Sequence, residues 1–190
     1  GVGQIVASRH PDYRVGEMFI GSLGWQDYSI QHPRGKEFVF STRKVTNPLR
    51  PLSTQLGVLG QAGATAYFGL LDIGKLKAGD KVLVSGAAGG IGSVAGQIAR
   101  IRGAGLVVGT AGSDAKCRWL REELGYDAVI NYKTENVTER LAELFPDGID
   151  VFFDNVGGDI LNEALGRLAM HARIVVCGFI STDYAPGTHH

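Results

Sequence analysis

The stretch VLVSGAAGGIGSVAGQIAR contains residues that could bind a phosphate group. It places Gly89 and Gly92 at the second and third positions of a G-x-G-x-x-G fingerprint, with Ala87 at the first. Gly89 would let the backbone approach a pyrophosphate, and Gly92 would let the following helix pack closely on a sheet. Free N–H groups at the helix start, around Gly90 and Ile91, would then face the phosphates. The loop follows a strand pattern and opens a helical one, so it predicts a dinucleotide site; the alternative is a tight turn without a ligand.

A second group of candidate residues stands in the stretch LVVGTAGSDAKC. An NAD-preferring site has a carboxylate roughly 20 residues beyond the loop, but this distance leads to Gly112, and no carboxylate ends the strand. Asp114 is expected to follow Ser113 into the next helix and to serve the helix dipole. Lys116 stands in the first turn, where a cation is unfavourable unless an anion lies beside it. The pattern predicts a site for a 2′-phosphate beside Ser113 and Lys116; the alternative is a solvated surface lysine.

The elements that would position these residues follow a regular alternation of strands and helices. Continuous apolar runs are typical of strands covered on both faces, and helical patterns lie between them. This alternation predicts an α/β fold with a doubly wound parallel Rossmann sheet. A sheet of two complete halves has about six strands, so the sixth is expected to be missing. The predicted strands are 81–86, 105–110, 127–132, 149–156 and 173–179.

Two of the predicted helices carry recognisable start signals. Asn136 with Glu139 predicts a capping-box-like start for the helix between strands 127–132 and 149–156. Asp159 is expected to cap the helix between strands 149–156 and 173–179. An earlier segment, ATAYFGLLDIG, is apolar all round. It predicts a helix buried between two layers.

The beginning of the chain has a different character. Short extended runs separated by Pro, Gly and Asp turns predict a β region there. We therefore expect domains at 1–50 and 51–180, with a tail at 181–190. The expected strands of the β region are 2–8, 17–21, 25–30 and 37–40.

Composition restricts the class of ligand and the location of the protein. The chain has 190 residues, and 19 basic residues balance 19 acidic ones. No broad positive field exists for nucleic acid or an anionic membrane surface, so an anion must be bound by a local site. Cys117 and Cys177 lie far apart in apolar surroundings, which favours a reduced, cytoplasmic protein. No apolar stretch is long enough to span a bilayer.

Several of these segments together resemble a known family. The stretch from GVLGQAGATAY to GQIAR, followed by AGSDAKC, INYK, DGIDVFFDNVGG and ARIVVCGFIS, is similar to the zinc-independent medium-chain dehydrogenase/reductases. Within them it is most similar to the prostaglandin reductase, leukotriene dehydrogenase and curcumin reductase group. The resemblance covers nearly the whole chain. It implies that residues 1–50 are part of a GroES-like β-barrel domain and that no metal is bound.

The resemblance also implies an activity and a cofactor. The family uses NADPH to reduce the carbon–carbon double bond of α,β-unsaturated ketones and aldehydes, by hydride transfer to the β-carbon. The residues matching Lys116 and Tyr132 hold the 2′-phosphate in that family, and the one matching Asn155 lies near the nicotinamide ribose. The backbone around Phe179 and Ile180 meets the carboxamide. The structural alternatives are a strand-end residue for Tyr132 and a turn residue for Asn155.

Two further residues receive roles from the resemblance alone. Thr65 is implied to line the cofactor cleft; its alternative is a helix cap. Tyr184 is implied to donate a hydrogen bond to the enolate oxygen that hydride transfer creates. It stands one position away from the family's tyrosine, and the asparagine that follows it in the family is absent.

Other functions make different demands on the sequence. A zinc alcohol dehydrogenase needs Cys and His ligands, and residues 1–60 contain no cysteine. A short-chain dehydrogenase needs Tyr-x-x-x-Lys, which no tyrosine here provides. An NADPH quinone oxidoreductase remains the nearest enzymatic alternative, and a cofactor-binding module without turnover remains another. An open sheet edge would favour a homodimer.

Overall fold

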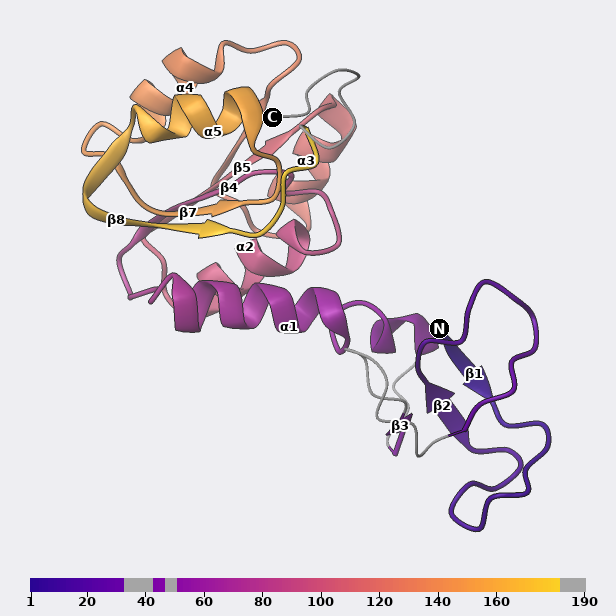
Figure 1. Ribbon diagram of the computed structural model, residues 1–190. Coiled ribbons are helices and arrows are strands. Elements are labelled where there is room, and N and C mark those ends of the chain that lie inside the picture. The colour runs from indigo at the N-terminus through magenta and orange to yellow at the C-terminus, as the bar shows by residue number, and fades with distance from the viewer. Residues whose placement is uncertain (33–42, 47–50, 182–190) are drawn as a thin grey trace, which may run out of the picture. The chain divides into compact units, whose positions relative to one another are not determined.

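A computed structural model describes residues 1–32, 43–46 and 51–181 (Figure 1). The chain forms two compact units, Gly1–Gln61 and Ala62–His190. The units divide later in the chain than residue 50, and the expected domain boundaries stay a prediction.

The first unit contains a small antiparallel sheet, as the pattern of short extended runs predicts. Its strand order is β1-β2-β3, and Gly3 on β1 stands opposite Phe19 on β2. Phe19 is the buried centre of this sheet. The elements of the unit are β1 (Val2–Gln4), β2 (Met18–Ile20), β3 (Arg43–Lys44) and a 3-10 helix at Leu52–Gln55.

One expected strand of this unit is wrong, and another cannot be compared. The run 25–30 forms no strand. Its large side chains, Trp25, Tyr28 and Ile30, are exposed, and no described segment pairs with it. The expected strand at 37–40 lies outside the described residues. An apolar run therefore becomes a strand only where a neighbour supplies hydrogen bonds and covers one face.

The second unit confirms the predicted parallel sheet. Its strand order is β6-β5-β4-β7-β8, all neighbouring pairs are parallel, and the described part of the unit contains five strands. β4, β5 and β7 lie in the interior of the sheet, and their side chains are almost all buried. The strands are β4 (Lys81–Val84), β5 (Leu106–Ala111), β6 (Ala128–Asn131), β7 (Ile149–Asp154) and β8 (Leu168–Val176).

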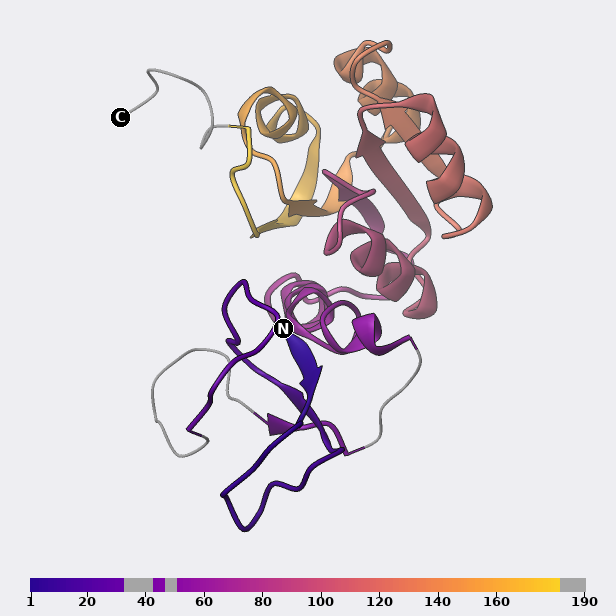
Figure 2. The same cartoon turned by 90° about the vertical axis from the view of Figure 1, so that its right-hand side faces the viewer.

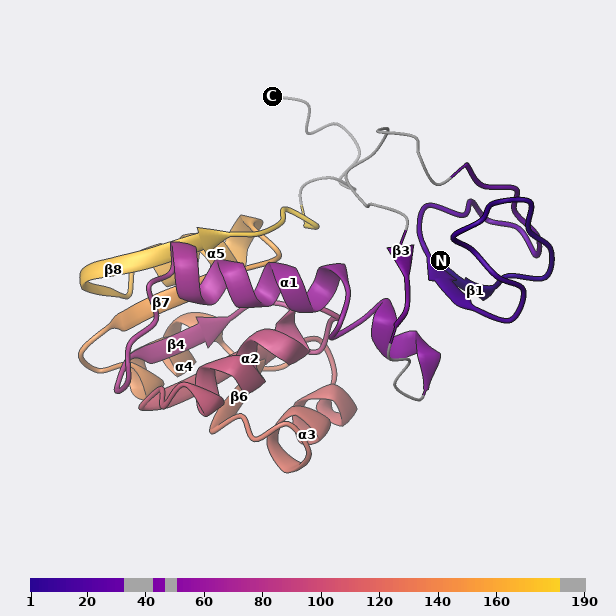
Figure 3. The same ribbon diagram turned by 90° about the horizontal axis from the view of Figure 1, so that it is seen from below.

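Helices cover both faces of this sheet, as a doubly wound fold requires. α4 and α5 lie on one face, and α1, α2 and α3 lie on the other (Figures 1 and 3). Figure 2 shows the same layers along the strand direction. The helices are α1 (Gln61–Phe68) with a π-helical turn at Gly69–Ile73, α2 (Gly92–Ile101), α3 (Asp114–Glu122), α4 (Val137–Leu144) and α5 (Gly158–Leu165).

α1 and its π-helical turn do not have the burial that the sequence predicts. Ala66 and Leu70 are fully buried against the sheet, but Tyr67, Phe68 and Ile73 are at least half exposed. The helix packs on one layer, and no described element of its unit covers the other side. The expectation of a helix buried between two layers is therefore wrong for the described structure.

The predicted start signals are confirmed in one case and wrong in the other. Asn136 accepts a hydrogen bond from the N–H of Glu139 at 3.3 Å, and its amide donates to the Glu139 carboxylate at 3.0 Å. Asn136 therefore caps the helix as predicted, and Glu139 pairs with the Asn136 side-chain amide instead of the backbone N–H that a full capping box uses. Asp159, in contrast, lies in the first turn of α5 and does not cap it. Gly157 precedes this helix with a φ of 69°, a conformation that glycine adopts without strain.

Tyr126 holds α2 against the sheet. Its ring is buried, and its hydroxyl donates to the carbonyl of Gly92 at 2.7 Å. A Cβ atom at Gly96 would lie 2.1 Å from the ring carbon Cζ of Tyr126, so only glycine fits there. Burial raises the pKa of Tyr126 far above its usual value, which keeps the hydroxyl protonated as a donor. These contacts therefore fix the distance between α2 and the sheet.

We expect Gly96→Ala to lower the free energy of unfolding by about 1–3 kcal/mol, the usual cost of overpacking a core. This loss should outweigh the gain of about 1 kcal/mol that alanine brings to a helix interior. Guanidinium denaturation measures the difference. Gln97→Ala, at an exposed position of the same helix, is the control and should change stability by less than about 0.5 kcal/mol. A Gly96→Ala protein as stable as the parent would contradict the proposed contact.

Candidate functional site

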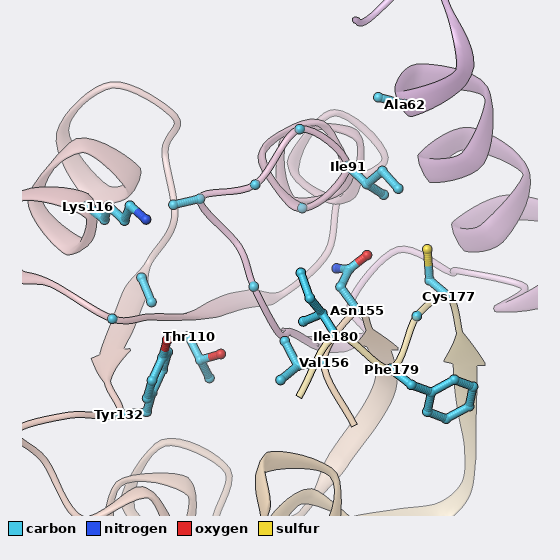
Figure 4. A pocket seen from close by; sticks show the side chains of 18 residues that line it. Ala62, Ile91, Thr110, Lys116, Tyr132, Asn155, Val156, Cys177, Phe179 and Ile180 are labelled. Atoms are coloured by element: carbon cyan, nitrogen blue, oxygen red, sulfur yellow. The ribbon is translucent and has the colours of Figure 1, made fainter. Parts of the chain in front are cut away.

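A cleft of about 630 Å³ opens at the carboxyl ends of the parallel strands (Figure 4). This edge is where open α/β sheets bind their ligands. Segments that follow β4, β5, β6, β7 and β8 all contribute to its walls. Nine of the residues predicted from the sequence line it, namely Gly89, Gly90, Ile91, Gly112, Lys116, Tyr132, Asn155, Phe179 and Ile180.

The glycine loop forms one wall of the cleft. Gly86 makes the turn out of β4 with a φ of 56°. A Cβ atom at Gly92 would lie 2.5 Å from the Gly86 carbonyl oxygen, so the helix start can approach the turn only without a side chain. A Cβ atom at Gly90 would meet nothing within 4 Å, which leaves its backbone open to the cleft. The loop therefore has the close packing that the fingerprint predicts.

The start of α2 also supplies unused hydrogen-bond donors. Within the described residues, the N–H groups of Gly90, Ile91 and Gly92 have no acceptor. Unsatisfied N–H groups at a helix N-terminus favour an anion, because the helix dipole adds a partial positive charge there. The middle of the cleft, after the central strand β4, therefore fits a pyrophosphate group.

The end of the cleft beside β5 and β6 carries a cation and a phenol. Lys116 stands in the first turn of α3, and Figure 4 shows its side chain directed towards the glycine loop. No described carboxylate forms an ion pair with it. Tyr132 follows β6, and a Cβ atom at Gly112 would lie 2.5 Å from its hydroxyl oxygen. Gly112 thus leaves room for the Tyr132 hydroxyl beside the end of β5.

Among the described residues no carboxylate lines this end of the cleft to compete with an anion. Asp114, the nearest one in sequence, accepts a hydrogen bond from the Asn131 amide at 2.6 Å and does not line the cleft. Lys116 stands at the positive end of the α3 dipole, so its charge is unfavourable there unless an anion binds. The donor set fits a phosphate monoester, whose charge and acceptor oxygens match an ammonium and a hydroxyl.

Two predicted site residues do not line the cleft. Ser113 caps α3, where its hydroxyl accepts a hydrogen bond from the N–H of Lys116 at 3.4 Å. Thr65 lies on α1, and it is Ala62, one turn earlier, that lines the cleft. Tyr184 lies outside the described residues, so its role stays a prediction.

The third wall consists of the turns after β7 and β8. Asn155 donates its amide N–H to the Ser85 carbonyl at 2.7 Å, which fixes its side chain beside the turn out of β4. Cys177 and Gly178 stand opposite and continue to Phe179. Burial, and after it the nearby Asp154 carboxylate, raises the pKa of the Cys177 thiol. The thiol is therefore protonated near neutral pH.

Sequence reasoning missed several lining residues. Gly86 makes the turn with a positive φ, one residue before Ala87, which the fingerprint places at its first position. A strand-ending Ser-Gly pair is the signal that could have identified it. Val156 and Cys177 adjoin predicted residues on the same turns. Thr110 is fully buried at the end of β5, and its hydroxyl has no described hydrogen-bond partner. A threonine inside an apolar strand gives no local signal of this kind.

The described residues contain no cluster of three or more His, Cys, Asp or Glu side chains that could hold a metal ion. None of the described helices is both long enough and apolar enough to cross a bilayer.

Comparison with known proteins agrees with this geometry. A putative NADP-dependent oxidoreductase of Bacillus subtilis, YfmJ, is 48% identical over 183 residues, which are 96% of this chain and 52% of that protein. The NADPH-dependent curcumin reductase of Escherichia coli is 42% identical over 190 residues, 98% of this chain and 53% of the enzyme. The chain therefore spans about half the length of the curated relatives it matches.

A solved structure shows the same fold. CurA from Vibrio vulnificus in complex with NADPH superposes with a TM-score of 0.87 at 39% identity, covering 100% of this chain and 55% of that one. The family model described as zinc-binding dehydrogenase matches residues 90–186, from the glycine loop to the end of the sheet and beyond. The chain belongs to this dehydrogenase family and, within it, to the zinc-independent reductases of the medium-chain dehydrogenase/reductase type.

Proposed function

We propose that this chain carries the cofactor-binding part of an NADPH-dependent reductase that acts on the carbon–carbon double bond of α,β-unsaturated ketones or aldehydes. The observation that carries the cofactor choice is the cation Lys116, which has no carboxylate partner among the described residues. It stands in the first turn of α3, just beyond the end of β5, where an NAD site has an acidic residue. The relation to NADPH-dependent curcumin reductase supports the same cofactor and the substrate class.

Each part of the cofactor has a matching group in the cleft. The free N–H groups of Gly90 and Ile91 would bind the pyrophosphate. Lys116 and the hydroxyl of Tyr132 would bind the 2′-phosphate, and Gly112 leaves the space for it. Ser113 and Thr65 would act indirectly, as the cap of α3 and as a neighbour of Ala62 on α1.

The reactive end would lie at the turns after β7 and β8. Asn155 would contact the nicotinamide ribose, and the backbone at Phe179 and Ile180 would bind the carboxamide. NADPH, when bound, supplies the hydride for the β-carbon of the substrate. The chain's own contribution is to hold the ring in one orientation, and Tyr184 would donate a hydrogen bond to the oxygen that becomes negative.

A cytoplasmic location and a homodimer also belong to the proposal. Both described cysteines are free, which supports a reducing compartment. β8 pairs only with β7 among the described strands, and its open edge supports association with a second subunit.

The cofactor assignment predicts a selective effect of Lys116→Ala. The variant should weaken NADPH binding by about 1–3 kcal/mol, the value of a charge-assisted contact, and leave NADH binding nearly unchanged. Fluorescence titration of the protein with both nucleotides measures this. Arg118→Ala removes an exposed cation from the same helix but from outside the cleft, and it should change neither affinity. Equal weakening of both nucleotides by Lys116→Ala would show that the lysine is structural.

Tyr132→Phe gives a finer test of the same site. Removing one neutral hydroxyl should weaken NADPH by about 0.5–1.5 kcal/mol and spare NADH. The phenyl ring keeps the packing beside Gly112, so thermal stability should be unchanged. An unchanged NADPH affinity would remove Tyr132 from the phosphate site.

The substrate class is tested by turnover with NADPH and either a simple enone or a quinone. We expect NADPH oxidation with the enone, and product analysis should find the saturated ketone. Turnover with the quinone alone would favour the quinone oxidoreductase alternative. Binding of NADPH with neither substrate reduced would favour a cofactor-binding module without turnover.

A further inference from the structure

Asp154 is a fully buried carboxylate at the carboxyl end of β7, and it does not line the cleft. Its Oδ1 accepts hydrogen bonds from the Ser85 hydroxyl at 2.6 Å and from the N–H of Val156 at 3.0 Å. The N–H of Gly157 donates to both carboxylate oxygens at 3.1 Å. A buried carboxylate is costly unless hydrogen-bond donors surround it, so loss of any of these contacts would be unfavourable. The contacts therefore hold the end of β4, through Ser85, next to the turn after β7.

The backbone of Asp154 also holds the turn after β8, which forms part of the cleft wall. Its carbonyl accepts hydrogen bonds from the N–H groups of Cys177 at 2.8 Å and Gly178 at 3.1 Å. The turns that follow β4, β7 and β8 therefore all meet at this residue. A shift of Asp154 would move each of them.

Ser85 completes the network by holding Asn155 at two points. The Ser85 hydroxyl, which donates to Asp154, accepts from the Asn155 N–H at 2.8 Å. The Ser85 carbonyl accepts from the Asn155 side-chain amide at 2.7 Å. Because a carbonyl oxygen can only accept, the atom that faces it must be Nδ2 of Asn155.

The orientation of the amide determines what Asn155 offers to a ligand. Its Oδ1 has no hydrogen-bond partner among the described residues, and Figure 4 shows the carboxamide at the cleft. An amide oxygen accepts from a hydroxyl but not from a phosphate or a carbonyl group, which have no hydrogen to donate. Within a dinucleotide the donors are the ribose hydroxyls, the adenine amino group and the carboxamide of the nicotinamide. A ribose hydroxyl is the donor next to the pyrophosphate, which the glycine loop after the neighbouring strand β4 would bind.

Strand order indicates which sugar this is. Lys116 and Tyr132 follow β5 and β6, whereas Asn155 follows β7, on the other side of β4. The hydroxyl therefore belongs to the ribose remote from the 2′-phosphate. We propose that Ser85 and Asp154 are positioning residues that hold Asn155 with Oδ1 towards this ribose, so that binding of the reactive half of the cofactor depends on a buried network outside the cleft. The inference rests on the proposed NADPH binding.

The test compares NADPH with adenosine 2′,5′-bisphosphate, which has the phosphate-bearing ribose but lacks the nicotinamide ribose. Ser85→Ala and Asn155→Ala should each weaken NADPH about three- to tenfold, the value of one hydrogen bond, and leave the bisphosphate unchanged. In the double variant the effects should not add, because loss of Asn155 removes the group that Ser85 positions. Titration calorimetry measures all the affinities.

Thr138→Val is the matched control. It removes another hydroxyl-to-carboxylate hydrogen bond, to Glu163 at 2.5 Å, that lies away from the cleft, and it should change neither affinity. If Ser85→Ala does not fold, Ser85→Cys replaces the hydroxyl with a weaker donor of similar size and gives the same comparison.

Three outcomes would overturn the inference alone: unchanged NADPH affinity in the Ser85 variant, equal weakening of the bisphosphate, or additive effects in the double variant. Failure of the parent protein to bind either nucleotide would instead refute the proposed function itself, and the inference with it.

Discussion

The cleft depends on the close approach of α2 to the turn that leaves β4. A Cβ atom at Gly92 would lie 2.5 Å from the Gly86 carbonyl oxygen, and the Tyr126 hydroxyl binds the Gly92 carbonyl at 2.7 Å. Any side chain at Gly92 would push the helix away from the strand. The free N–H groups of Gly90 and Ile91 would move with it. The segment Gly90–Gly92 thus has two roles at once: it packs closely against the core, and it directs its N–H groups into the cleft. A change in the packing would therefore also change the direction of these donors.

Much of the second unit could be predicted from the sequence because its signals are local. The runs at β4, β5 and β7 are mostly apolar, and only a sheet covered on both faces buries such runs almost completely. Tyr67 and Phe68 mark the limit of this reasoning. Their types predict a helix with apolar sides, but a pattern does not specify which neighbour covers each side, and here one side stays exposed.

The site was predictable to the extent that it follows chain order. The glycine loop and Lys116 stand at fixed spacings from strands, so counting residues locates them. Thr65 shows how a helix position can miss the cleft although Ala62, one turn earlier on the same helix, lines it. The pair Ser85 and Asp154 is separated by 69 residues in the sequence. No periodicity links two such positions; the sheet topology alone brings them together.

The arrangement of charges explains how a chain with no net charge can select an anionic ligand. A broad positive surface would attract any polyanion. This cleft instead places a different polar group after each of several strands along the sheet edge. Backbone N–H groups at the glycine loop match a diester, and the ammonium of Lys116 matches a monoester of higher charge. The amide oxygen of Asn155 is unfavourable beside a phosphate, because it can accept a hydrogen bond but cannot donate one. In the strand order β5-β4-β7 the ammonium comes first, the glycine loop second and the amide oxygen last. Under the proposed function a ligand satisfies the cleft when it carries a phosphate monoester, a pyrophosphate and a hydroxyl in that order, so selectivity would arise from the order of polar groups along the carboxyl edge rather than from their total charge.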